Sequence, residues 1–261
     1  MNELELLIDF HKDAERQGPG STTETLKALD FIPENDRASL KIADIGCGTG
    51  AQTITLAEKI EGEITAVDLF PEFLDRLTKK SKELGLEEKI KTLKADMQDL
   101  PFSEEAFDVI WSEGAIYNIG FEKGFRQWRK FLKPGGYLAV SEITWITDSR
   151  PQEIEYHWNQ EYPEIDTASG KIKLLEENGY SPIGYFALPE YCWIENYYQP
   201  MEERFEAFLD KYNQSVMVKN FIELHKEEIL MYKNFKEYFS YGFYIAKKVQ
   251  AKSDHKKSGT S

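Results

Sequence analysis

Residues 42–50 contain the part of this chain that is best suited to bind a nucleotide. They form a short apolar run that ends in glycines at alternate positions, Gly46, Gly48 and Gly50, with Asp44 just ahead of them. Glycine has no Cβ, so a glycine turn lets backbone amides contact a ligand directly. A helix that begins after the turn adds unpaired N–H groups and the positive end of its dipole. We therefore expect this turn to bind a nucleotide that also carries a carboxylate or phosphate.

Acidic residues also end the next two apolar runs. Asp68 follows the strand-forming residues 63–67, and a carboxylate there can accept hydrogen bonds from both vicinal hydroxyls of a ribose. Each such bond contributes roughly 1.5–3 kcal/mol. Asp96 follows a third run and precedes the polarizable Met97. An adenine suits this position, because its exocyclic amine can donate to Asp96 while Leu69 and Met97 contact its two faces.

Two classes of nucleotide cofactor fit the glycine turn and Asp68. Residues 46–51 also satisfy the looser fingerprint of NAD-binding folds, so a nicotinamide-dependent oxidoreductase is one alternative. Asp44 favours the other class, because an acid beside the turn would repel a pyrophosphate but can accept hydrogen bonds from loop amides or from an ammonium group. The residues thus favour a nucleotide joined to an amino acid.

The ordered set of motifs resembles the class I S-adenosylmethionine-dependent methyltransferases, especially the small-molecule branch related to ubiquinone and menaquinone biosynthesis. Residues 42–50 are similar to that family's first motif, Asp68 to its ribose-binding acid, and Asp96 with Met97 to its adenine contact. Residues 107–112 and 132–138 are similar to its fourth strand and to the turn before its fifth. The resemblance implies transfer of a methyl group from S-adenosylmethionine to a nitrogen, oxygen or carbon atom of a small molecule. A non-catalytic protein that binds this cofactor is a further alternative.

The residues and the resemblance together predict a set of cofactor-binding positions. Arg16 is expected to contact the carboxylate of the cofactor, and Cys47 to present its backbone rather than to act as a nucleophile. The full predicted set is Arg16, Asp44, Gly46, Cys47, Gly48, Gly50, Asp68, Leu69, Asp96, Met97 and Ser112.

Candidates for acceptor chemistry follow the fourth and fifth predicted strands. Glu113 and Tyr117 can orient the acceptor or accept its proton, or can instead be a helix-start acid and a packing aromatic. His157 is the candidate general base, because an imidazole titrates near neutral pH. The substrate pocket is predicted from aromatic residues, for which packing of the later helices is the structural alternative: Trp145, Trp158, Trp193 and Tyr197.

The elements that must position these residues alternate along the chain. Strands are predicted near 41–45, 64–68, 90–95, 107–111 and 137–142, with helices between them, which is typical of a parallel sheet covered on both faces. A strand near 180–188, helices over 200–212 and 216–236, and a last strand over 238–246 follow. The resemblance implies that this last strand is antiparallel, so the predicted fold is a Rossmann-like, doubly wound seven-stranded α/β sheet.

The predicted elements divide the chain into a core with additions. A first amphipathic helix is expected to end at residues 18–20, and Ser21 and Glu24 have the spacing of a capping box for a second helix that ends near Phe31. The expected parts are an N-terminal helical cap (1–39), the cofactor-binding core (40–189), a helical insert that is a candidate lid (190–237), the returning strand (238–250) and a disordered tail (251–261).

Composition narrows the partners and the compartment. The net charge of −14 argues against a nucleic-acid acceptor, since phosphates would be repelled. Two cysteines far apart in the sequence argue against a secreted, disulfide-built domain and favour the cytoplasm. No apolar run approaches the roughly 20 residues of a membrane span, so no membrane partner is expected. The four widely spaced histidines predict no metal site, and the acceptor and the oligomeric state stay open.

Overall fold

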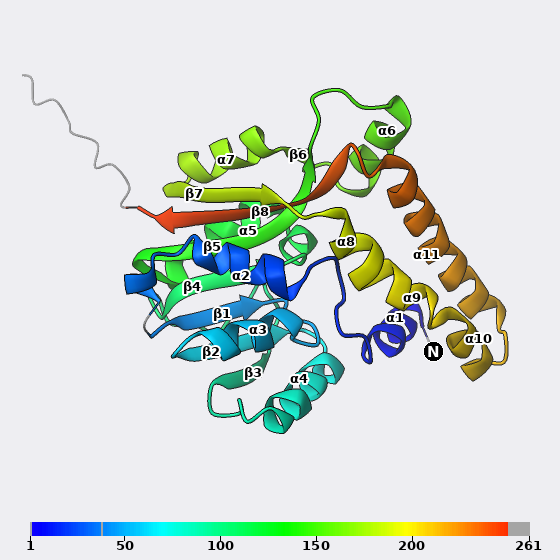
Figure 1. Cartoon of the computed structure of the whole chain (residues 1–261), viewed down its shortest axis with the longest axis horizontal. Helices are drawn as coiled ribbons and strands as arrows, with labels where there is room; N and C mark the ends of the chain where they lie inside the picture. Colours follow the sequence, from blue (N-terminus) through cyan, green and yellow to red (C-terminus); the bar gives the residue numbers. More distant parts are fainter. Residues whose placement is uncertain (1, 38, 250–261) are drawn as a thin grey trace, which may run out of the picture.

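A single mixed sheet organises the chain in this computed structural model, which describes residues 2–37 and 39–249. The continuous sheet has the strand order β3-β2-β1-β4-β5-β8-β7 (Figure 1). Its strands are β1 (Lys41–Ile45), β2 (Glu63–Asp68), β3 (Ile90–Lys94), β4 (Phe107–Glu113), β5 (Leu132–Trp145), β7 (Tyr180–Ala187) and β8 (Phe239–Lys248). Strands β1 to β5 are parallel, whereas β8 is antiparallel to both β5 and β7. The predicted α/β fold with an antiparallel last strand is confirmed.

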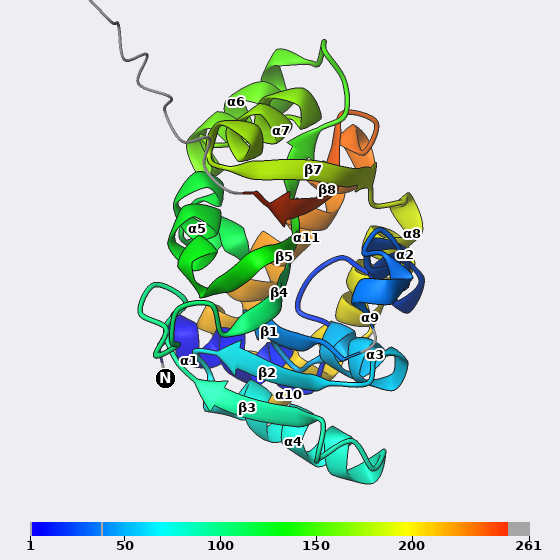
Figure 2. The same ribbon diagram turned by 90° about the vertical axis from the view of Figure 1, so that its left-hand side faces the viewer.

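Helices cover both faces of the sheet, as Figure 2 shows in a view along it. One face carries α2 (Thr22–Asp30), α3 (Ala51–Lys59) and α4 (Pro71–Glu83); the other carries α5 (Phe121–Trp128) and α7 (Ala168–Glu177). Successive residues of a strand point to opposite faces, so Ile42 contributes to the first core and Ala43 to the second. Burial on both faces explains why β1 has no exposed residue after Lys41.

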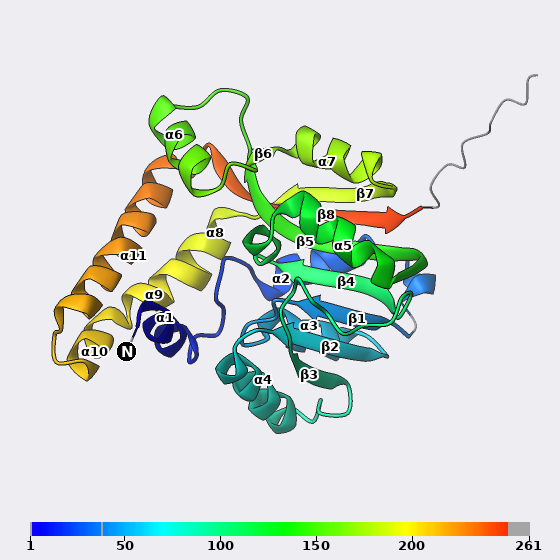
Figure 3. The ribbon, with the colours of Figure 1, turned by 180° about the vertical axis from the view of Figure 1, so that it is seen from behind.

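A group of helices lies beyond the carboxyl ends of the parallel strands. It consists of α1 (Glu3–His11), α8 (Glu190–Trp193), the π-helical η4 (Ile194–Tyr198), α9 (Gln199–Glu202), α10 (Phe205–Lys211) and α11 (Val216–Phe235). Figure 3 shows α1 beside α9 and α10, with α11 running from α10 back toward α6 (Gln152–Glu161). Phe10 of α1 contacts the rings of Phe205, Phe208 and Phe221, so the first helix and the late insert share one apolar cluster.

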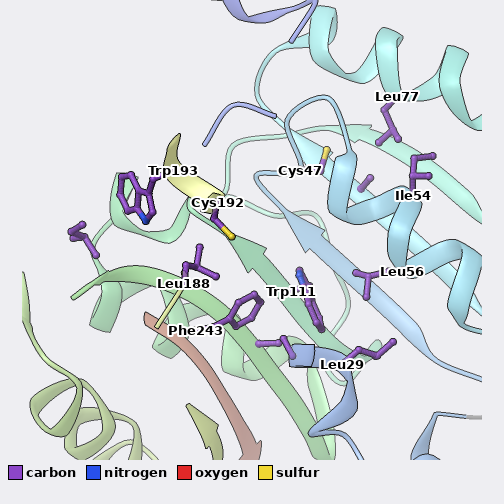
Figure 4. Close-up of a cluster of buried hydrophobic side chains, with 14 of the residues drawn as sticks. Leu29, Cys47, Ile54, Leu56, Leu77, Trp111, Leu188, Cys192, Trp193 and Phe243 are labelled. Atoms are coloured by element: carbon purple, nitrogen blue, oxygen red, sulfur yellow. The ribbon is translucent and has the colours of Figure 1, made fainter. Parts of the chain in front are cut away.

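The insert is joined to the sheet by a continuous buried cluster (Figure 4). Trp111 of β4 contacts Phe243 of β8 edge-on, with ring centroids 5.6 Å apart. Trp193 of α8 stacks on Tyr232 of α11 at 4.5 Å. The helices of the insert are therefore anchored in the core through aromatic side chains. In the described part of the chain, no helix combines the length and apolar character that a membrane crossing requires.

The structure differs from the sequence-based expectations near the N-terminus. Helix α1 ends at His11 rather than at residues 18–20, because Thr49 donates to the Ala14 and Glu15 carbonyls and Gln17 donates to the His11 carbonyl. These bonds draw the segment after α1 onto the glycine turn.

The predicted capping box of α2 is only half formed. The Ser21 hydroxyl accepts from the Glu24 amide at 3.0 Å, but the Glu24 carboxylate instead accepts a hydrogen bond from Tyr191. Two further features were not predicted: β5 is extended at both ends, and the short β6 (Asp166–Thr167) pairs with it off the main path of the sheet. The predicted disordered tail, 251–261, lies outside the described residues.

Candidate cofactor and acceptor site

The glycine turn leaves no room for side chains. Gly46 and Gly48 have left-handed φ values of 76° and 56°, which favour glycine. A Cβ on Gly46 would overlap the Cβ of Ala115, and one on Gly48 would overlap the side chain of Gln17. The Gly46 and Cys47 amides donate to the Val67 carbonyl at 2.8 and 2.9 Å, which ties the turn to the end of β2.

A cavity of about 510 Å³ lies at the carboxyl ends of β1, β2 and β4. Eleven of the predicted site residues line it, from six separate parts of the chain: Arg16, Gly46, Cys47, Gly48, Asp68, Leu69, Asp96, Met97, Glu113, Tyr117 and Tyr197. Open α/β sheets bind their ligands in this position, where loops from several strands converge. The fold therefore brings most of the predicted residues into one cavity.

Asp68 is held in place by the backbone around it. One carboxylate oxygen accepts from the Gly48 amide at 2.9 Å and the other accepts from the Phe70 amide at 3.0 Å. Burial raises the pKa of Asp68, while these backbone hydrogen bonds lower it. Each carboxylate oxygen has lone pairs beyond the one that the amide uses. Asp68 can therefore accept hydrogen bonds from a ligand without rearranging.

The end of β3 is organised in a similar way. Asp96 accepts from the Gln98 amide at 2.8 Å, and the Met97 carbonyl accepts from the Trp128 indole at 2.9 Å. Leu69 is 51% exposed although it is apolar, and it lines the cavity together with Met97. An exposed apolar side chain beside a fixed carboxylate suits a flat heterocycle with an amine on its edge.

Three predicted cofactor residues lie behind the cavity rather than on its surface: Asp44, Gly50 and Ser112. Gly50 is the N-cap residue of α3, and the Ser112 hydroxyl donates to the Ile45 carbonyl at 2.8 Å. Asp44 is fully buried and accepts from Thr53 at 2.5 Å and from Gln52 at 3.2 Å. These residues support the turn from behind.

Asp44 acts on the cavity through Gln52, which sequence analysis missed. Burial raises the pKa of Asp44 to about 7, although its hydrogen bonds from Thr53 and Gln52 lower it. The Gln52 amide also donates to the Cys47 carbonyl at 3.1 Å, and Gln52 lines the cavity. The position of Gln52 on the helix that follows a glycine turn is the signal that could have identified it.

The segment between α1 and α2 closes over the glycine turn. The Gln17 side chain accepts from the Thr49 amide at 2.8 Å and donates to the Thr49 hydroxyl at 3.0 Å. Arg16 lies 3.5 Å from Glu113, which also accepts from Thr25 at 2.7 Å and from Trp111 at 2.9 Å. Glu113 therefore has several partners already, and its placement favours a role in holding this segment over a role as a base.

The remaining wall of the cavity comes from the helices. We call it the helical wall and define it as His11 of α1, Tyr117 of the short η2 (Ile116–Asn118), Tyr197 of η4, and His225 and Glu228 of α11. Sequence analysis identified the two tyrosines but missed His11, His225 and Glu228. The three-residue spacing of His225 and Glu228 on a predicted helix was the available signal for that pair.

His11 is buried in the helical wall. Burial and, to a smaller extent, the nearby charges of His225 and Arg204 lower the pKa of the imidazole to about 3, so the ring is neutral at physiological pH. Its side chain is 6% exposed, and its Nδ1 has no hydrogen-bond partner among the described residues. The cavity wall thus contains a neutral ring nitrogen whose hydrogen-bonding capacity is unused.

Three predicted acceptor aromatics and His157 lie elsewhere. Trp145 and Trp193 are buried, and the Trp193 indole donates to the Ser240 hydroxyl at 3.0 Å. Trp158 packs on Phe239 with ring centroids 5.1 Å apart. These three positions agree with the packing alternative. His157 lines a separate surface groove between α6 and α11, so its placement does not support a role as the general base.

Comparisons with known proteins match the part of the chain that contains the glycine turn and the strand-end acids. A family model for a methyltransferase domain matches residues 42–136. The biotin biosynthesis bifunctional protein BioHC of Teredinibacter turnerae is 36% identical over 115 residues, which cover 39% of this chain and 19% of that protein. The ubiquinone/menaquinone biosynthesis C-methyltransferase UbiE of Idiomarina loihiensis is 30% identical over 111 residues, covering 41% of this chain and 44% of that protein. The matched part spans less than half the length of these two relatives.

A solved structure extends the comparison to nearly the whole fold. An S-adenosylmethionine-dependent methyltransferase from Geobacter sulfurreducens, in complex with S-adenosylhomocysteine, has a TM-score of 0.81 to this chain at 14% identity. The alignment covers 93% of this chain and 97% of that one, which shows a shared fold. These matches support the predicted family and its cofactor: residues 42–136 match a methyltransferase domain, and the chain shares its fold with an S-adenosylmethionine-dependent methyltransferase.

Proposed function

We propose that this protein transfers a methyl group from S-adenosylmethionine to a nitrogen, oxygen or carbon atom of a small molecule. The observation that carries the proposal is the cavity at the strand ends, which the glycine turn, Asp68 and Asp96 line together. A volume of about 510 Å³ lies within the usual range for small-molecule sites.

The residues of the cavity fit an adenosine joined to an amino acid. Asp68, oriented by two backbone amides, would accept hydrogen bonds from the ribose hydroxyls. Asp96 would accept from the adenine amine, with Leu69 and Met97 against the ring faces. Arg16 and Gln52 reach the same cavity beside the glycine turn, where they would meet the carboxylate and ammonium of the amino-acid end.

S-adenosylmethionine supplies a methyl group on a sulfonium, and transfer forms a bond from that carbon to the acceptor, returns the carbon–sulfur electron pair to sulfur and releases a proton from the acceptor. The chain itself has to align the two molecules and to exclude water. Alignment alone contributes roughly 7–11 kcal/mol in the best intramolecular models. We propose that the segment 12–20 and helices α8 to α11 cover the cavity for this purpose.

Two measurements test the proposed function. S-adenosylmethionine and S-adenosylhomocysteine should raise the melting temperature of the full chain, whereas NAD and NADH should not, because ligands stabilise the state that binds them. Formation of S-adenosylhomocysteine is then followed in the presence of a panel of small amines, alcohols and carbon acids. Stabilisation by NAD alone would identify a nicotinamide enzyme, and binding without turnover on any acceptor would identify a non-catalytic binding protein.

A further inference from the structure

The charges that line the cavity are mostly negative. Its ionisable acids and its arginine are Asp68, Asp96, Glu113, Glu228 and Arg16, and no lysine among the described residues lines it. Arg16 already pairs with Glu113 at 3.5 Å, so its charge is partly compensated. A negatively charged acceptor would be repelled here, whereas a cation would be attracted.

Glu228 places one of these negative charges in the helical wall. One of its carboxylate oxygens accepts from the Tyr198 hydroxyl at 3.0 Å, and no other hydrogen bond or ion pair of Glu228 is found among the described residues. His225 lies one helical turn before it, and the His225 Nδ1 is 2.8 Å from the Phe221 carbonyl of the same helix. The carbonyl can only accept, so the His225 Nδ1 donates to it. Burial raises the pKa of Glu228, while the charge of His225, the Tyr198 hydrogen bond and the charge of His157 lower it. Among the described residues, no cation lies within ion-pair distance of the Glu228 carboxylate.

Two tyrosine rings complete this part of the wall. Burial raises the pKa of the Tyr117 and Tyr197 phenols, so both stay neutral at physiological pH. Neutral aromatic rings attract cations through the negative faces of their π systems. A carboxylate with two neutral rings beside it is an arrangement suited to an ammonium group.

The ring of His11 adds to this wall a buried polar atom that has no partner in the described part of the chain. The side chain is more than nine-tenths buried, it lines the same cavity, and its Nδ1 has no hydrogen-bond partner among the described residues. Buried polar atoms are nearly always hydrogen-bonded in folded proteins.

We propose that the methyl acceptor is an amine that binds as its ammonium ion, with Glu228 balancing the charge and Tyr117 and Tyr197 against it. The ammonium gives one N–H proton to Glu228, and the lone pair that this frees attacks the methyl carbon. This inference rests on the proposed methyltransferase function and adds the chemical class of the acceptor. It predicts that acceptors with a phosphate or a net negative charge bind poorly, since no free cation among the described lining residues would meet them.

The test compares two molecules of the same shape that differ in charge. Choline and its uncharged isostere 3,3-dimethylbutan-1-ol are titrated by calorimetry into the full chain saturated with S-adenosylhomocysteine. Choline should bind at least about tenfold more tightly than the alcohol, and phosphocholine more weakly than choline. Undetectable choline binding, or an alcohol or phosphocholine that binds as tightly as choline, would overturn the proposal.

Variants assign the preference to Glu228. Glu228→Gln removes the charge but keeps an oxygen that can accept from Tyr198, and it should reduce the preference for choline to less than about threefold. Glu227→Gln makes the same change at the exposed neighbouring residue of α11 and should leave the preference intact. A full preference in Glu228→Gln contradicts the proposal. Failure of the wild-type chain to bind S-adenosylhomocysteine contradicts the proposed function instead.

Discussion

At the residue scale, the proposed recognition of the cofactor depends on carboxylates whose positions are set before any ligand arrives. Asp68 is the clearest case, because two backbone amides fix its two oxygens while lone pairs remain for a ligand. Asp44 shows the contrasting case of a fully buried acid that orients Gln52 instead of facing the cavity. Both acids end or nearly end parallel strands, yet only one is a candidate for direct contact.

Replacing Asp68 tests its role directly. Asp68→Ala should weaken binding of S-adenosylhomocysteine by about 2–4 kcal/mol, or roughly 30- to 1000-fold, because the ribose hydroxyls lose a charged partner. Calorimetry on the full chain measures the change. Asp75→Ala, an exposed position on α4, is the control and should bind normally. Equal affinity of wild type and Asp68→Ala would remove Asp68 from the site.

At the element scale, a buried ion pair fixes helix α7 against the sheet. Lys171 of α7 and Glu142 of β5 are both fully buried, with Nζ and Oε1 3.3 Å apart. Lys171 also donates to the Glu164 carbonyl at 2.8 Å. Burial raises the pKa of Glu142 to about 7 and lowers the pKa of Lys171, while each partner's charge opposes the other's shift. Each residue therefore needs the charge of the other to stay ionised in the buried site.

Removing one partner should be costly. Lys171→Met should lower the free energy of unfolding by about 3–5 kcal/mol, because it leaves Glu142 buried without its cation. Lys173→Met on the exposed side of the same helix should change it by less than about 0.5 kcal/mol. Denaturant unfolding at pH 8, where Glu142 is more fully ionised, measures both. A Lys171→Met protein as stable as the control would show that the pair contributes nothing.

At the scale of the whole molecule, buried titratable groups make the stability depend on pH. The pKa of Asp44 is about 7 in the folded protein, well above the value of about 3.9 for an unfolded chain. The folded state therefore binds more protons between these values, so the contribution of Asp44 to stability is largest at low pH and is lost as pH rises toward 7. His11 has the opposite effect on the pH dependence of stability. Its pKa is lowered in the folded protein, so the unfolded chain binds more protons at acid pH and acid favours unfolding.

Asp44→Asn isolates the first of these effects. Relative to this variant, the wild type should lose about 2–3 kcal/mol of unfolding free energy between pH 5 and pH 8, since each pKa unit corresponds to about 1.4 kcal/mol. The contributions of the other titratable groups to this pH dependence cancel in the comparison, because both proteins contain the same groups. Asp99→Asn, at an exposed position, should show no such pH-dependent difference. Parallel pH profiles for wild type and Asp44→Asn would refute the prediction.

The local patterns were sufficient to predict that the glycine turn and the acids at the strand ends lie together. Gly46, Gly48, Asp68 and Asp96 occur at strand ends, and parallel strands bring their carboxyl ends to one edge of a sheet, so sequence position alone determines that these residues meet. The limits of β1 were predicted to the residue because apolar strand formers stop at the glycine turn.

The proposed acceptor half depends on contacts that no local pattern encodes. Trp193 and Tyr197 are four residues apart, yet the first is buried in the core and the second lines the cavity, because η4 lies between the core and the strand ends. His157 resembles a base in sequence, but α6 carries it to another surface.

By itself, the sequence determined the strands of the sheet and the acids at their carboxyl ends, because periodicity and turn chemistry act over a few residues. The antiparallel direction of the last strand was implied by the family resemblance. Only the tertiary structure decided which side chains form the helical wall. His11 and Glu228 are 217 positions apart in the chain and meet because aromatic packing of Phe10 against α10 and α11 brings the first helix to the insert. Burial also keeps the His11 ring neutral, and the extent of that desolvation depends on the surrounding fold.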